Sequence, residues 1–237
     1  MFLHLFLTLA SGLLLVPPPP IIFPTGEEVD VPAISEVVID VDPDDLLDGL
    51  DAPFPDEALP ESFVNPPPGE ESILEEADLA SPFTADGFPG GIGDVSFTFD
   101  TNPDLVDGIL TGGQVSYVVT DHDLSRGEIR ALHAVMEEEL ANQAEADLPE
   151  GVDRYDTRAD LEQFGGVESV SATIAMEGTG LNLVISHLFV PVGNTLVVNT
   201  VVISMFSDVA LPTVSALTEE LAAATIQYLG DVAESAG

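Results

Sequence analysis

The chain has 237 residues and sets 43 acidic residues against four cations, all of them arginine, for a formal net charge of −39 at pH 7. So few cations cannot neutralise a phosphate backbone, which excludes a nucleic-acid-binding protein. The sequence contains no Cys, which excludes disulfides and thiolate metal sites.

This excess of negative charge destabilises a compact fold in dilute solution through self-repulsion. Because the Debye length falls to about 3 Å at 1 M salt, concentrated brine removes most of that repulsion. The absence of Lys beside abundant Asp and Glu resembles the composition of proteins from extreme halophiles. We therefore expect a halophilic protein, with an acidic secreted protein from an ordinary host as the alternative.

Residues 1–16 (MFLHLFLTLASGLLLV) form an apolar run, which the four prolines of residues 17–20 end. A bilayer-spanning helix needs about 20 apolar residues and proline interrupts a helix, so a signal peptide fits better than a membrane span. We predict that residues 1–23 are a signal peptide or membrane anchor, although the usual basic residues are missing. The alternative is a buried core helix. The predicted location is extracytoplasmic, either secreted or membrane-anchored.

Residues 24–90 are acidic and rich in proline. Sixteen of the 19 prolines lie in residues 1–103, and no hydrophobic period is sustained there. Since proline removes backbone donors and like charges extend a chain, we expect a largely disordered linker. Short apolar runs such as Leu46-Leu47 could dock on the domain or form single helical turns, and residues 70–79 are the best helix candidate.

Closely spaced aspartates in this linker raise the question of calcium binding, because Ca²⁺ takes six to eight oxygen ligands. The EF-hand loop needs Gly at position six and Glu at position twelve. A loop that starts at Asp40 has Asp45 and Asp51 there, and one that starts at Asp44 has Pro55 at position twelve. The pattern fails, so we expect a solvated acidic run that binds cations weakly and without specificity.

Residues 91–237 carry the patterns of a globular domain, and their length is sufficient for a proper core. Alternating apolar side chains predict a strand over residues 95–99. Residues 114–120, entered through Gly112-Gly113, predict a second strand that pairs with the first.

A helix is expected next, because Ser125 and Glu128 have the spacing of a capping box. The helix is predicted to end near Ala146, and residues 153–164 to form a less regular connector with local ion pairs. Apolar residues recur in the helix at intervals of three to four: Ile129, Leu132, Met136 and Leu140.

Three further strands are predicted over residues 169–176, 181–190 and 195–206, followed by a last helix that begins near residues 211–213. Together these elements predict an α+β fold, with an antiparallel sheet of about five strands covered by two helices and preceded by a disordered acidic, proline-rich segment. The stripe that should pack the last helix on the sheet consists of Val214, Leu217, Leu221, Ala224, Tyr228 and Val232.

The closing meander and helix, LNLVISHLFVPVGNTLVVNTVVISMF followed by PTVSALTEELAAATIQYL, resemble the PsbP-like superfamily, and so does the preceding QFGGVESVSATIAMEG. That superfamily includes the photosystem II PsbP proteins and the mycobacterial LpqN-type secreted proteins. The resemblance covers about residues 91–237. It implies an exported, non-catalytic protein that binds partner proteins or ligands, and it assigns no functional residue.

Few residues suggest chemistry. Asp121, His122 and Asp123 are candidate metal ligands just before the capped helix, but adjacent carboxylates at a helix start also interact with its dipole without any metal. His187, on a predicted central strand, is expected to be a hydrogen-bonded core histidine. No G-x-S-x-G motif is present, and P-loop and S-x-x-K motifs need a Lys that the chain lacks.

We predict an exported, non-catalytic binding or interaction module that recognises a protein or small ligand and no nucleic acid. Residues 1–23 would supply any membrane attachment. No cofactor is expected beyond weakly bound calcium or other cations. Two alternatives remain open: a cell-surface structural component that gathers cations, and a hydrolase that depends on carboxylates or a metal.

Overall fold

The structure is a computed structural model of the full chain. Residues 1–23, the predicted signal peptide or anchor, lie outside its described part, as does Asp40 of the aspartate run. Among the described helices, none has the length and apolar character needed to cross a bilayer. The described residues are 34, 37, 39, 41–77, 79–80, 83–106, 110–145, 152–178, 181–205 and 211–237.

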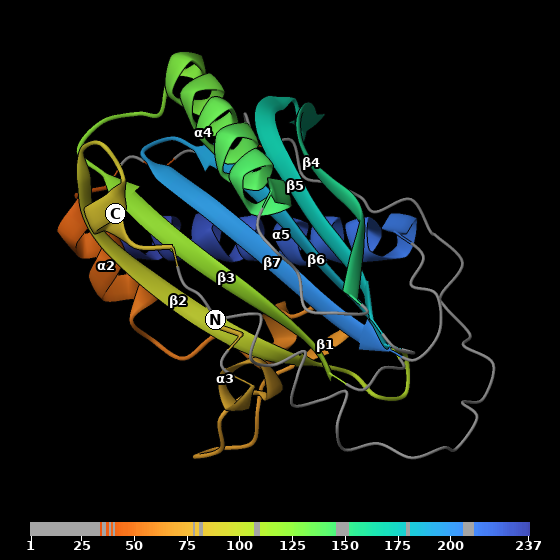
Figure 1. Ribbon diagram of the computed structural model, residues 1–237. Coiled ribbons are helices and arrows are strands. Elements are labelled where there is room, and N and C mark those ends of the chain that lie inside the picture. Colours follow the sequence, from red (N-terminus) through yellow and green to blue (C-terminus); the bar gives the residue numbers. More distant parts are fainter. Residues whose placement is uncertain are drawn as a thin grey trace.

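A seven-stranded sheet forms the centre of the molecule and curves into a half-barrel (Figure 1). Every neighbouring pair is antiparallel, and the strand order is β1-β2-β3-β7-β6-β5-β4. The predicted meander of three strands is confirmed as β5-β6-β7. The strands are β1 (Phe63–Val64), β2 (Gly91–Thr101), β3 (Leu110–Thr120), β4 (Val152–Phe164), β5 (Val167–Gly178), β6 (Leu181–Val192) and β7 (Thr195–Met205).

The prediction of about five strands and two helices is wrong. The expected connector over residues 153–164 is strand β4, at one edge of the sheet. Its alternating charges hid it, since edge strands carry charged residues that oppose further pairing. The expected ion pairs are present in it, with Arg158 at 3.7 Å from Asp156 and 3.4 Å from Asp160. The other edge strand, β1, comes from the segment predicted to be disordered.

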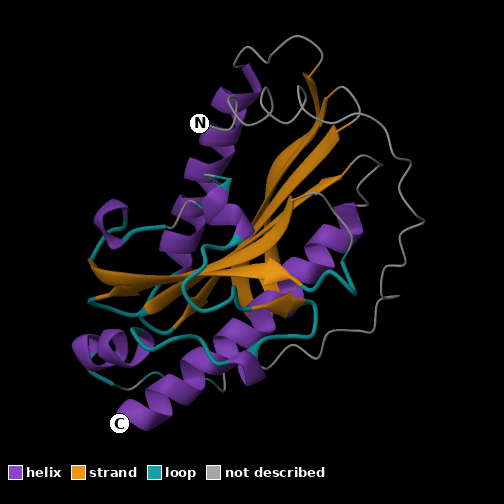
Figure 2. Cartoon of the chain, turned by 90° about the horizontal axis from the view of Figure 1, so that it is seen from below, coloured by secondary structure: helices purple, strands orange, loops and turns teal. Residues whose placement is uncertain are grey.

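Four α-helices are present in the described part, and they cover both faces of the sheet. Helix α4 lies in front of the sheet and α5 behind it in Figure 1, and the perpendicular view of Figure 2 shows helices on both sides. The capping box at the start of α4 is confirmed by hydrogen bonds in both directions between Ser125 and Glu128. The helices are α2 (Pro43–Leu50), α3 (Ile73–Glu76), α4 (Arg126–Glu145) and α5 (Leu211–Ala236).

The acidic segment before the sheet is ordered over residues 41–77, so the prediction of disorder there is wrong. Helix α2 begins with Pro43 behind the N-cap Asp42, a favourable start for a helix. Leu46 and Leu50 share one face of α2 and are fully buried. Helix α3 is shorter than the helix predicted over residues 70–79. A few apolar anchors at helical spacing therefore outweigh an acidic, proline-rich composition.

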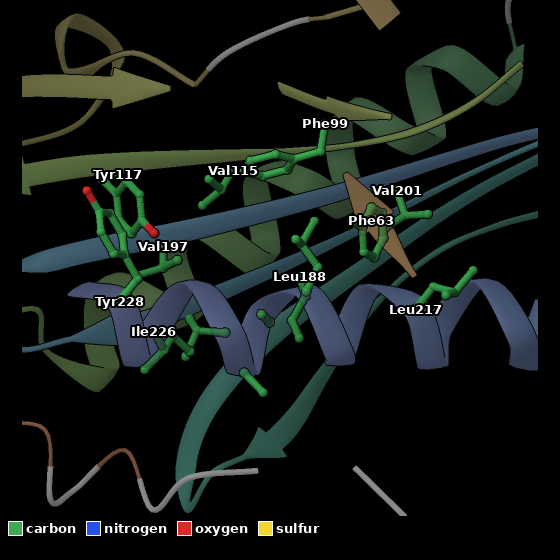
Figure 3. Packing of buried hydrophobic residues seen from close by; sticks show 14 of the residues in the cluster. Phe63, Phe99, Val115, Tyr117, Leu188, Val197, Val201, Leu217, Ile226 and Tyr228 are labelled. Carbon is green, nitrogen blue, oxygen red and sulfur yellow. The ribbon is translucent and has the colours of Figure 1, made fainter. Parts of the chain in front are cut away.

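The largest core lies between the sheet, α5 and α2. Figure 3 shows Val115, Leu188 and Val201 of the sheet with Leu217 and Ile226 of α5. A fully buried large apolar side chain contributes about 1.5–3 kcal/mol, so α5 is a major stabilising element. Smaller clusters under α4 and under α3 close the opposite face.

Strand β3 lies between β2 and β7, and all 11 of its residues are buried. At Gly113, a Cβ atom would lie 2.7 Å from Cε1 of Phe63 and 2.9 Å from Cδ2 of Leu221. At Gly112, a Cβ would lie 2.7 Å from Cγ of Leu74 on the other face. This glycine pair lets the side chains of Phe63 and Leu221 on one face, and of Leu74 on the other, approach β3 closely.

Candidate functional site

An open groove of about 640 Å³ runs along the carboxyl-terminal half of α5. Its second wall is the end of α2 and the chain that follows it, over residues 49–60, which includes the short 3₁₀ helix η2 (Asp56–Ala58). We call this cavity the α5 groove. The α5 wall consists of Ala224, Gln227, Tyr228, Asp231, Val232 and Ser235.

Helical spacing explains the α5 wall, because its residues recur at intervals of three and four. The residues of the predicted apolar stripe of α5 therefore fall into two groups, those buried in the core and those that are half-buried in the groove wall. Leu221 and Tyr228 are buried, whereas Ala224 and Val232 are half-buried and face the groove.

Two contacts hold the second wall against α5. Gly49 lies so close to Val232 that a Cβ atom on the glycine would be 2.7 Å from Cγ1. The ring of Phe54 packs on the ring of Tyr228 with centroids 4.4 Å apart. Because Phe54 and Leu50 are buried in the same core, the groove is held by the tertiary packing of α2.

The groove is mainly apolar and carries two acidic groups. Proline rings of Pro53, Pro55 and Pro60 line one wall, and prolines offer no backbone N–H there. Glu57 and Asp231 stand on opposite walls and are both exposed. Among the residues that the structure describes, the lining contains no Arg, Lys or His.

Tyr228 is the aromatic residue of the groove. Its side chain is 7 % exposed, and burial raises the pKa of its hydroxyl above 10. Within the described ranges that hydroxyl has no hydrogen-bond partner, unlike the hydroxyl of Tyr117, which donates to the carbonyl of Thr225 at 2.9 Å. Figure 3 shows the two tyrosines beside each other at one end of the α5 core. The buried side-chain atoms without a partner in the described part of the chain are Nδ2 of Asn199 and Oγ of Ser204, so the Tyr228 hydroxyl is not buried and can donate to water or to a polar atom of a ligand.

The predicted metal candidates form a charged cluster at the start of α4. Nδ1 of His122 lies 2.6 Å from Oδ1 of Asp121, and Nε2 lies 2.6 Å from Oε1 of Glu128. Asp123 is exposed and outside this chain of contacts. In the described part of the molecule, no three His, Asp or Glu side chains are grouped so that they could hold a metal ion.

Hydrogen bonds set the protonation of this cluster. Those to Asp121 and Glu128 raise the pKa of His122 above its ordinary 6.5. Hydrogen bonds from Ser125 and His122 lower the pKa of Glu128 to about 2. The arrangement is therefore that of an imidazolium between two carboxylates, and it ties the end of β3 to the start of α4.

His187 of β6 is a hydrogen-bonded core histidine, as expected. Its Nδ1 lies 2.8 Å from Oγ1 of Thr200. The centroids of the Phe83 and Phe189 rings lie 6.3 Å and 6.0 Å from that of the imidazole, and the two phenylalanine rings also contact each other. Burial lowers the pKa of its imidazole to about 4. The side chain is neutral near pH 7 and lies on the opposite side of the sheet from α5.

Two half-buried carboxylates face each other across the edge of the α5 core. Burial raises the pKa of Glu162 in β4, and the charge of Glu219 in α5 raises it further. Burial also raises the pKa of Glu219. Sequence reasoning missed this pair because 43 carboxylates offer too many combinations. Neither residue lines the α5 groove.

Fold and groove together define an α+β domain with an open surface site between its last helix and its amino-terminal segment. No protein-family model matches the sequence, and the search of curated proteins finds no relative. The geometry of the α5 groove is therefore the evidence for function.

Proposed function

We propose that the protein is an exported binding module that holds a partner or ligand in the α5 groove. The observation that carries this proposal is the groove itself, an open cavity of about 640 Å³ with apolar walls and a few polar groups. Binding sites in proteins typically measure about 300–1,000 Å³ and combine apolar lining with a small number of polar groups.

Rigidity of the walls supports binding. Helix α5 is anchored by buried residues along its length, and the second wall is fixed through Phe54. A site formed before its ligand arrives loses less conformational entropy on binding. Export is part of the proposal because residues 1–23 have the composition of a signal peptide or anchor.

A tryptophan reporter tests the proposal, because the chain has no Trp of its own. Gln227 is exposed and lines the groove, so Gln227→Trp places one indole at the rim. Ala216 is exposed on the same helix outside the groove, and Ala216→Trp is the matched control. Fragments and short peptides are titrated against both variants. Saturable emission changes confined to the Gln227→Trp variant support the proposal, and equal or absent responses in both contradict it.

A second candidate function follows from the net charge of −39. A cell-surface component that gathers cations would use exposed carboxylates of many elements at once, since each exposed ion contact contributes little alone. Reversible assembly on addition of calcium, followed by light scattering, supports this function. Unchanged scattering across millimolar calcium contradicts it.

A further inference from the structure

We propose that the occupant of the α5 groove is a positively charged peptide segment with apolar side chains, contributed by a partner protein. The inference rests on the proposed function and specifies the chemistry of its ligand.

The described lining of the groove carries negative charge only. Glu57 and Asp231 stand on the two walls, and in the described part of the chain neither side chain takes part in an ion pair or side-chain hydrogen bond. No described cationic side chain lines the groove, and the four arginines of the chain lie in α4 and β4. A cationic side chain between the walls would meet a carboxylate from each side.

Tyr228 adds a hydrogen-bond donor to the groove. The residue lines the groove and is largely buried, but its hydroxyl is not among the buried side-chain atoms without a partner, so it can meet solvent or a ligand. A backbone carbonyl of a bound peptide would accept a hydrogen bond from this hydroxyl. The proline rings of the facing wall would pack against apolar side chains of the same peptide, which removes apolar surface from water.

The length of the groove sets the length of the segment. On α5 the lining extends from Ala224 to Ser235, which at 1.5 Å per residue is about 17 Å. An extended peptide rises about 3.3 Å per residue, so about five residues fit along the groove.

Other occupants fit less well. An acidic peptide or an anionic lipid surface would add repulsion to that of a chain with net charge −39. A second copy of this chain carries the same charge. Opposite charge on the partner both accelerates encounter and selects against acidic competitors.

The test uses three capped peptides of about five residues in which Leu alternates with Lys, Glu or Gln. Each peptide is titrated into the full chain carrying Gln227→Trp, at the lowest salt that preserves the native circular dichroism. The Lys peptide is expected to bind at least about tenfold more tightly than the Glu peptide, and to weaken as salt rises.

Neutralising variants show whether the groove carboxylates are responsible. The double change Glu57→Gln and Asp231→Asn should weaken Lys-peptide binding by about two- to fivefold per carboxylate, as expected for exposed ion pairs. Asp45→Asn with Glu138→Gln removes the same charge from exposed positions outside the groove and should alter affinity less than about twofold.

Each outcome decides a specific point. Binding of the Gln or Glu peptide as tight as that of the Lys peptide, or equal effects of the two double variants, overturns this inference and leaves the α5 groove as a binding site. If no peptide and no fragment changes the emission of the Gln227→Trp variant, the proposed function fails as well.

Discussion

Replacing Leu50 by alanine tests whether the acidic amino-terminal segment is a structural part of the domain. Leu50 is fully buried in the core between α2 and α5, next to the glycine that contacts Val232. Removing a buried leucine side chain loses its transfer free energy and leaves a cavity, which together cost about 2–5 kcal/mol. A disordered linker would give a change near zero. The variant should therefore lose a large fraction of a typical unfolding free energy of about 5–15 kcal/mol.

Urea unfolding at molar salt, followed by far-UV circular dichroism, measures this loss, because urea is uncharged and leaves screening unchanged. The matched control is Leu161→Ala, since Leu161 is 42 % exposed on the edge strand β4. That change should alter stability by no more than about 0.5 kcal/mol. If Leu50→Ala is no more destabilising than Leu161→Ala, the packing of α2 on α5 does not contribute to the native state.

Further predictions concern glycines, salt and pH. Gly113→Ala should lower the unfolding free energy by about 1–3 kcal/mol through overpacking. Gly127→Ala in α4 should raise the unfolding free energy by about 0.5–1 kcal/mol, because glycine is unfavourable in a helix and a Cβ there meets nothing closer than 3.6 Å. Dialysis into dilute buffer should abolish near-UV and far-UV signals of native structure. In NMR titrations His122 should titrate above 6.5, and Glu128→Gln should lower its pKa. His187 should titrate near 4, so stability should decline as pH falls from 6.5 toward 4, and His187→Gln should remove that decline.

The two histidines change the folding stability in opposite directions as pH falls. The raised pKa of His122 gives a contribution that is complete below 6.5 and declines as pH rises through the native pKa. Glu128, with its pKa lowered from 4.5 to about 2, contributes above 4.5 and loses that contribution as pH falls through about 2. The cluster is therefore most stabilising between 4.5 and 6.5. The histidine predictions are wrong if His122 has a pKa below 6.5 or His187 has a pKa near 6.5. Native structure retained in dilute buffer would contradict the salt prediction. A Gly113→Ala variant as stable as the parent would contradict the overpacking prediction.

Local patterns were sufficient to predict several elements. The apolar alternation in β5 indicated a strand, although β5 is buried on both faces, and the period near 3.6 in α4 and α5 indicated helices. The capping box of Ser125 and Glu128 is also local, because its hydrogen bonds span three residues.

Strand β4 and the order of the acidic segment could not be predicted without knowing which elements pack against them. An edge strand keeps its charges in solvent on one side, so β4 lacks the apolar alternation of an inner strand. In residues 41–77, anchors such as Leu46 and Leu74 are too sparse to predict order by composition. Their burial is favourable only because α5 and β3 present complementary surfaces.

By itself, the sequence determined the charge, the meander of β5-β6-β7, the two long helices and the apolar stripe of α5. Only the tertiary structure decided that β3 pairs with β7, that α2 packs on α5, and that their junction leaves an open groove. The physical reason is distance along the chain. Residues 49–60 and 224–235 are far apart in sequence, and no local preference reports a contact that forms only when both pack on one core.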